Sequence, residues 1–164
     1  FHYPPGGRRA SLSRHLVDKL EAVPPAIARA SVADLVSGQT FAEWYRKPAG
    51  AFPLAYLSPE AAARLGAKTQ LVGLSEETLA KQLREHPEIT LDEYPTVQAA
   101  IDRGEAVLDA RDGSLIYILE EEGYVTVIKA TKTGKAIFMT SLRRLSKDAA
   151  RRDRELQRLL RKAR

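Results

Sequence analysis

The chain has 164 residues, 44% of them hydrophobic, and a formal net charge of +5, which is typical of a globular domain with enough apolar sequence for a core. It has no cysteine and three histidines, which excludes disulfide scaffolds, thiol nucleophiles and thiolate zinc sites and makes a histidine-rich metal site an unfavoured reading. No apolar run approaches the roughly 18 residues that would span a bilayer, and no basic-then-apolar leader opens the chain.

The first 47 residues are predicted to form a helical arm or linker unit. Because the sequence starts at Phe1, we expect a processed product or a piece of a longer protein. Two prolines and two glycines within residues 1–9 indicate a turn or joint. Helical spacing of apolar residues then predicts three helices, over residues 10–23, 25–37 and 40–46.

The middle of the chain mixes short extended pieces with well-marked helix starts. Extended runs are predicted at 52–57 and 69–72, and helices at 58–66, 75–86 and 90–104. Ser58 and Ser75 are expected to cap the first two of these helices, and Thr90 with Glu93 forms a capping box for the third.

From residue 105 the apolar period changes from 3.6 to 2. Four strands are predicted at 106–109, 114–119, 124–131 and 135–141, joined by tight turns that contain glycine. The sequence therefore predicts an α+β fold in which N-terminal helices pack on a four-stranded antiparallel meander. The predicted domain spans residues 52–145, and a basic helix follows over 146–164.

The basic charge is concentrated at the C-terminal end. Residues 143–164 hold ten Lys or Arg against three Asp or Glu, a net +7, whereas residues 1–142 carry −2. Such a helix can present a solvated amphipathic face, dock on a partner through its leucines, or contact nucleic acid. The sequence leaves these alternatives open.

The predicted hairpin of residues 124–141 places several polar side chains near one turn. Lys129 and Thr131 share a strand face with the valines before them. Whether Thr140 or Ser141 lies beside them depends on the length of the turn at 132–134, because a one-residue slip exchanges the faces. Alone, these residues are typical of a solvated hairpin, and His86 is typical of a surface position at a helix end.

Three strings carry a family resemblance: LSEETLAKQLREHPEITLDEY at 74–94, VIKATKTGK at 127–135 and FMTSLRR at 138–144. They resemble the phage-associated branch of the barnase/EndoU/colicin/RelE-like nuclease superfamily, found at the C-terminus of phage minor head (head morphogenesis) proteins of the Mu F type. The resemblance covers residues 52–144, and residues 1–47 resemble the joint and helices that precede such domains.

The resemblance implies a metal-independent RNA endonuclease, in which the 2′-hydroxyl of RNA attacks the adjacent phosphate and leaves a 2′,3′-cyclic phosphate. A proton acceptor, a proton donor and positive charge at the phosphate suffice for this reaction. The expected catalytic residues are His86 as acid or base, Lys129 and Arg143 at the phosphate, Thr131 with Thr140 or Ser141 as hydrogen-bond donors, and Lys81 in a lesser role. No glutamate stands beside Lys129 as a barnase-like base, so Glu85 or Glu88 would have to reach in from the helix.

The resemblance also sets expectations for partners and location. The expected nucleic-acid-binding residues are Lys132, Lys135, Arg144, Arg151 and Arg154, with no metal and no small-molecule cofactor. RNA is the expected substrate, phage head or portal proteins or an inhibitor protein are possible partners, and no membrane contact is expected. The expected location is the virion or the bacterial host cytoplasm, where the domain acts on host RNA or as a prophage-derived toxin. The rival is a non-catalytic virion structural or nucleic-acid-binding module that uses the basic C-terminal helix.

Overall fold

The computed structural model describes the backbone of residues 7–163 and the side chains of residues 12–163. Of the joint expected at residues 1–9, residues 1–6 lie outside the described residues and residues 7–9 belong to the first helix. The helices are α1 (Gly7–Glu21), α2 (Pro25–Val36), α3 (Gln39–Arg46), α4 (Pro59–Arg64), α5 (Glu76–Glu85), α6 (Thr96–Arg103) and α7 (Ala149–Leu160), with 3-10 turns η1 (Leu91–Glu93) and η2 (Arg161–Ala163). The strands are β1 (Phe52–Tyr56), β2 (Leu71–Leu74), β3 (Glu105–Leu108), β4 (Leu115–Leu119), β5 (Tyr124–Ala130) and β6 (Ile137–Arg144). Among these described helices, none is both long and apolar enough to cross a membrane.

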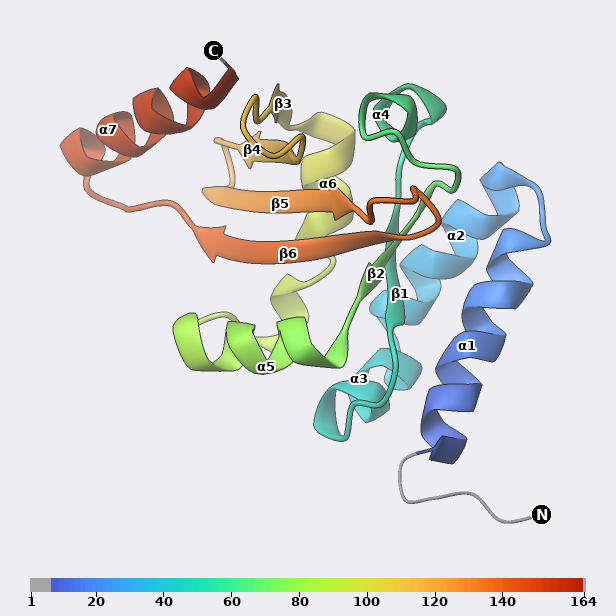
Figure 1. Cartoon of the computed structure of the whole chain (residues 1–164). Helices are drawn as coiled ribbons and strands as arrows, with labels where there is room; N and C mark the ends of the chain where they lie inside the picture. Colours follow the sequence, from blue (N-terminus) through green and yellow to red (C-terminus); the bar gives the residue numbers. More distant parts are fainter. Residues whose placement is uncertain (1–6, 164) are drawn as a thin grey trace.

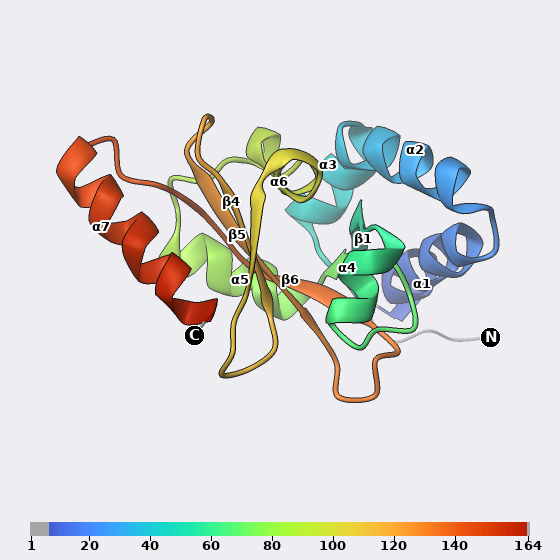
Figure 2. The ribbon, with the colours of Figure 1, turned by 90° about the horizontal axis from the view of Figure 1, so that it is seen from above.

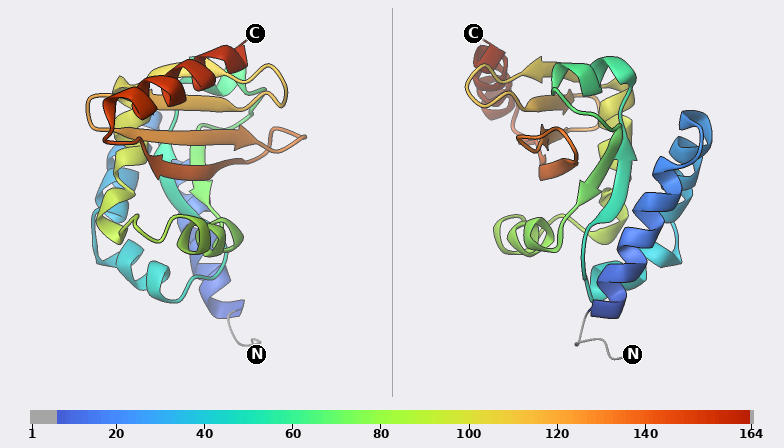
Figure 3. Two further views of the ribbon diagram at one scale, coloured as in Figure 1. Left: turned by 90° about the vertical axis from the view of Figure 1, so that its left-hand side faces the viewer. Right: turned by 45° about the vertical axis from the view of Figure 1, so that its right-hand side comes forward.

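All six strands form one mixed sheet in the order β1-β2-β6-β5-β4-β3. The β2–β6 pair is parallel and the other pairs are antiparallel. Figure 1 shows β1 and β2 running steeply across the direction of β5 and β6, and the right-hand view of Figure 3 shows the same twist. The α+β class is confirmed, but the expected four-stranded antiparallel sheet is corrected to a six-stranded mixed one. The two short extended runs near residues 52–57 and 69–72 carried no signal of which strand they would join.

The predicted helix starts have the expected chemistry. The Ser58 and Ser75 hydroxyls each accept a hydrogen bond from a backbone N–H three residues on. The capping box of Thr90 and Glu93 is also present. It opens only a 3-10 turn, however, and α6 begins after Pro95, because proline has no N–H to donate to the preceding turn.

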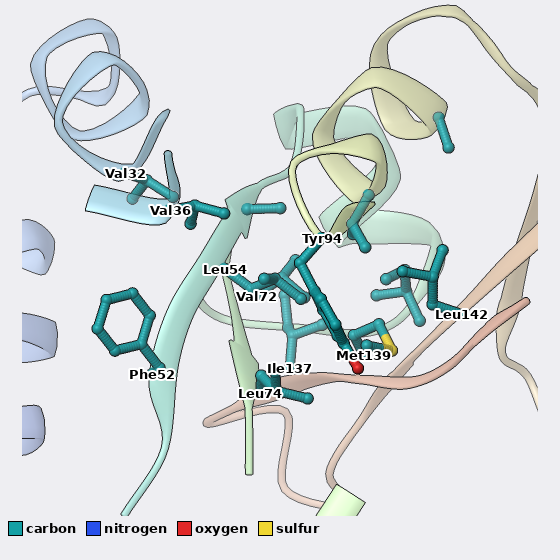
Figure 4. Close-up of a cluster of buried hydrophobic side chains, with 14 of the residues drawn as sticks. Val32, Val36, Phe52, Leu54, Val72, Leu74, Tyr94, Ile137, Met139 and Leu142 are labelled. Atoms are coloured by element: carbon teal, nitrogen blue, oxygen red, sulfur yellow. The ribbon is translucent and has the colours of Figure 1, made fainter. Parts of the chain in front are cut away.

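The main core lies between β1, β2, β6 and the helices α2, α3 and α6. Figure 4 shows its centre, where Leu54, Tyr94 and Met139 meet from three parts of the chain. The rings of Phe41 and Phe52 lie 5.1 Å apart between centroids and join α3 to β1. Residues of α1, α2 and α3 belong to this same cluster. The N-terminal helices therefore contribute to the core of the sheet.

A second, smaller core lies on the other face of the sheet, under α7. Along β4, Tyr117 points into the main core, whereas Ile116 and Ile118 belong to the second cluster. Leu156 and Leu159 of α7 pack on that cluster. Figure 2 shows α7 and α6 on opposite sides of these strands. The C-terminal helix is thus docked on the sheet through its leucines while its other faces meet solvent.

Candidate nucleic-acid interface

A β-bulge in β6 decides which side chains lie beside Lys129. Val127 pairs with Ser141, and the next residue, Ile128, pairs with Met139, so Thr140 is the extra residue. Directly opposed residues point to the same face of a sheet. Ser141 therefore lies on the face of Val127 and Lys129, whereas the Thr140 hydroxyl donates to the Val127 carbonyl oxygen at 3.3 Å.

The same pairing places one aromatic and three polar side chains along a single face, which we call the open face: Lys129, Phe138, Ser141 and Arg143. Phe138 is directly opposite Lys129, and Arg143 is directly opposite Val125. These residues lie on the α7 side of the sheet, next to the part that Leu156 and Leu159 cover. The open face is therefore a strip along β6 with positive charge at both ends.

At the C-terminal end of β6, four arginines surround a shallow groove between the strand and α7. We call it the arginine groove, and its arginines are Arg143, Arg144, Arg151 and Arg158. Arg143 donates to Glu155 at 2.8 Å, and Arg144 pairs with Glu93 at 2.6 Å. Within the described residues, the side chains of Arg151 and Arg158 have no hydrogen-bond or ion-pair partner. These two guanidinium groups are available to an anion.

The groove continues as a stripe along the exposed side of α7. Arg151, Arg154, Arg158 and Arg161 follow one another at intervals of three or four residues, which places them on one side of a helix. All four are exposed. Arg152 is turned differently and donates to the Glu120 carbonyl oxygen. The helix therefore presents leucines to the sheet and a row of arginines to solvent.

Behind the groove, Glu93 links three elements. It accepts hydrogen bonds from the Tyr124 hydroxyl at 2.6 Å and from Arg144 Nε at 2.8 Å. Burial alone would raise the pKa of Glu93, but the hydrogen bonds from Tyr124, the Thr90 N–H and Arg144 outweigh it and lower that pKa. Burial, followed by the Glu93 carboxylate, raises the pKa of Tyr124. An ionised Glu93 thus holds Arg144 in place at the end of β6.

Helix α5 lies against the free edge of the C-terminal half of β6, and its C-terminal end points the same way as the strand (Figure 1). Gln82 is hydrogen-bonded to Leu142, and Lys81 Nζ donates to the Thr140 carbonyl oxygen. His86 stands at the end of α5, about 6 Å along the helix axis from Gln82. It is the C-cap of α5, beyond the two residues that contact β6. Its side chain is 25% exposed, and Nδ1 lies 3.7 Å from a Glu88 carboxylate oxygen.

The remaining candidates lie at the other end of the hairpin, around the loop at 131–136. Lys129 Nζ is 3.8 Å from an Asp112 carboxylate oxygen. Hydrogen bonds from the Ser114 N–H and hydroxyl lower the pKa of Asp112, so it faces Lys129 in the ionised form. The loop is fixed by Gly134, whose carbonyl accepts from the Lys68 N–H at 2.7 Å and whose positive φ suits glycine.

Within that loop, the Thr131 hydroxyl is occupied by contacts with the backbone of Ala136. Lys132 and Lys135 are exposed, and neither side chain has a hydrogen-bond or ion-pair partner in the part of the chain that the structure describes. These two lysines extend the positive charge of the open face beyond the start of β6.

The structure thus separates the sequence candidates into two groups. Phe138, beside Lys129, and Leu142, beside α5, are separated by about 13 Å of strand, and His86 lies further on in the same direction. His86, Arg143 and Arg144 share one end of the hairpin. Lys129 and Thr131 share the other, so they do not meet His86 at one phosphate. The left-hand view of Figure 3 faces the C-terminal end of β6, with α7 above the strand and α5 below it.

Sequence reasoning did not single out Glu93, Tyr124, Gln82 or Arg158 as parts of this site. The capping box identified Glu93 only as a helix start, and Arg158 was detectable as one turn beyond Arg154. Nothing in the sequence indicated Tyr124 or Gln82, because their partners come from distant strands.

Among the described residues there is no group of three His, Asp or Glu side chains placed to hold a metal ion. No family model, no curated protein and no solved structure matches this chain.

Proposed function

We propose that this chain binds single-stranded RNA by its phosphates along the open face and the arginine groove, and cleaves it at the His86 end. The observation that carries the proposal is the pair of unpartnered guanidinium groups, Arg151 and Arg158, across a groove from Arg143 and Arg144. Guanidinium groups bind phosphate oxygens bidentately. Placement in a phage or prophage head-associated protein rests on the family resemblance alone.

The proposed chemistry uses the RNA strand as its own nucleophile. The 2′-oxygen forms a bond to phosphorus, the bond from phosphorus to the 5′-oxygen breaks, and His86 takes the 2′-hydroxyl proton. The leaving 5′-oxygen receives a proton from solvent. Arginines of the groove stabilise the charge that develops on the phosphate oxygens. Imidazole is the side chain that most often acts as a general base in enzymes, and a Glu88 carboxylate oxygen lies 3.7 Å from Nδ1 of His86.

The second candidate is RNA binding without turnover. The separation of Lys129 and Thr131 from His86 favours it, because a catalytic cluster must converge on one phosphate. The contacts that already occupy Lys81 and Arg143 point the same way. Under this alternative the arginine groove and the stripe on α7 hold nucleic acid in an assembly.

One gel assay decides between the two candidates. End-labelled RNA is incubated in EDTA with the wild type, His86→Ala and Lys129→Ala, and binding is measured in parallel by fluorescence anisotropy. We expect wild type to leave cyclic-phosphate ends, His86→Ala to bind without cutting, and Lys129→Ala to cut with weakened binding. Equal binding by all three proteins with no cleavage from about pH 5 to about pH 8, the range over which an unperturbed imidazole changes charge, would establish the second candidate. Absence of RNA binding would contradict both.

A further inference from the structure

A pocket of about 270 Å³ lies beyond the other end of the open face, between α1, β2 and the start of β6. Its floor is apolar and includes Leu71, Gly73 and Phe138. Gly73 is directly opposite Phe138 in the parallel β2–β6 pair, so both side-chain positions face the same way as Lys129. The pocket and the open face are therefore parts of one continuous surface.

The floor is suited to a planar ring. A Cβ at Gly73 would lie 3.4 Å from two ring carbons of Phe138 and 3.7 Å from the Ala51 side chain. The absence of that Cβ lets the Phe138 ring lie close over β2, where it lines the pocket, and aromatic side chains stack on every kind of nucleobase.

The rim carries both charge types. Lys135 has no side-chain partner within the described residues. Arg14 pairs with Asp18 at 3.3 Å, and both of those side chains are largely exposed, so solvent weakens this pair. Glu21 lies about two turns beyond Arg14 on α1, where one carboxylate oxygen accepts from the Thr69 hydroxyl at 3.2 Å. This combination suits neither a purely apolar ligand nor a bare anion.

We propose that this pocket binds one nucleotide unit, with the base on Phe138 and the phosphate between Arg14 and Lys135. Glu21 and Thr69 are placed to accept from the donor groups of a base. The volume is close to the lower end of the roughly 300–1,000 Å³ typical of small-ligand sites, which suits a single nucleotide.

This inference rests on the proposed function, because the bound nucleotide would be one end of the RNA strand. Lys129, directly opposite Phe138, would hold the next phosphate, and Ser141 and Arg143 lead from there to the arginine groove. The nucleotide pocket would anchor the strand, and the groove would hold the part that is cut. The path requires several nucleotides, so a dinucleotide should bind much more weakly than an octanucleotide.

The test uses adenosine 5′-monophosphate as the probe, with adenosine and inorganic phosphate as matched controls. Binding is mapped by amide chemical shifts in the folded wild-type chain. We expect the monophosphate to shift Leu71, Gly73 and Phe138, and each control to bind much more weakly. Lys135→Ala should raise Kd about tenfold through loss of one charge-assisted contact. Lys147→Ala, which removes an exposed lysine near α7, should leave it unchanged.

A cavity-filling variant, Ala136→Leu, adds a second measurement and should abolish binding while the remaining amide spectrum stays that of the wild type. Shifts confined to other residues, or inorganic phosphate binding as tightly as the nucleotide, would overturn the inference. If octanucleotide binding depends on Arg151 and Arg158 but the monophosphate leaves the pocket unshifted, the inference fails and the proposed function stands. If the monophosphate binds here but the octanucleotide does not bind, the proposed function and the strand path fail.

Discussion

The side-chain amide of Gln82 occupies the place of a neighbouring strand at Leu142. Its nitrogen donates to the Leu142 carbonyl oxygen at 2.8 Å, and its oxygen accepts from the Leu142 N–H at 3.1 Å. β2 reaches β6 only at the start of that strand. Without Gln82, the N–H and carbonyl of Leu142 would therefore be buried without partners. Lys81 does the same for the carbonyl of Thr140 at the bulge. These hydrogen bonds fix α5, and with it His86, beside the C-terminal half of β6.

Removal of the Gln82 amide should therefore destabilise the fold. Gln82→Leu leaves the N–H and carbonyl of Leu142 buried and unpaired, which should lower the free energy of unfolding by about 2–4 kcal/mol. Urea denaturation measures the loss, and amide exchange at Leu142 should accelerate. Leu83→Ala, at the exposed neighbouring position, should cost less than about 1 kcal/mol. Equal losses of unfolding free energy in the two variants would show that the Gln82 amide does not stabilise β6 through Leu142.

For Tyr94 we expect that removal of the polar group costs little stability. Its hydroxyl is buried and has no hydrogen-bond partner among the described residues. The neighbouring Gln82 uses both polar atoms on Leu142. Burial raises the pKa of Tyr94 to about 12, and the nearby Gln82 amide opposes that rise only in part. Tyr94→Phe should change the free energy of unfolding by less than about 1 kcal/mol, or increase it, because no hydrogen bond is lost. A thermal or urea melt that shows a loss above about 2 kcal/mol would reveal a partner for the hydroxyl.

Glu93 predicts how stability depends on pH. Its pKa in the folded protein lies below the ordinary value of 4.5, so the ionised carboxylate stabilises the fold above that value. The contribution is lost as the pH falls through the folded pKa. Glu93→Gln should cost about 1–3 kcal/mol at neutral pH, and its difference from wild type should shrink in acid. Asp92→Asn, at the exposed neighbouring carboxylate, serves as control. A loss that persists unchanged in acid would contradict the assignment.

The sequence predicted correctly those contacts in which both partners lie within a few residues of each other. Ser58, Ser75 and the Thr90–Glu93 capping box all form the predicted contacts, because capping depends on the first turn alone. The period of 2 also located β4 and β5 correctly. The helix predicted to begin at Thr90 begins only after Pro95, since a capping box does not indicate how far the following helix runs.

Features that depend on distant pairing were not predictable. The bulge at Thr140 puts Phe138, Ser141 and Arg143 on one face, although strict alternation would separate Phe138 from the other two. Two short strands far from β6 in sequence carried no indication of a parallel β2–β6 pair. The expected gathering of His86 and Lys129 rested on motif order, which contains no information about which end of a strand each residue reaches.

The salt dependence of RNA binding tests the central claim most directly. Affinity of a fluorescent single-stranded octanucleotide is measured from about 50 to about 200 mM salt, where counterion release dominates. The wild type is compared with Arg151→Ala/Arg158→Ala and with Arg46→Ala/Lys19→Ala, which removes the same charge from α3 and α1. The account predicts that the groove variant binds more weakly and that its slope of log K against log salt falls by about 1.4, two phosphate contacts fewer. The control pair should keep the wild-type slope. Equal slopes in all three proteins would contradict the arginine groove as the phosphate-binding site.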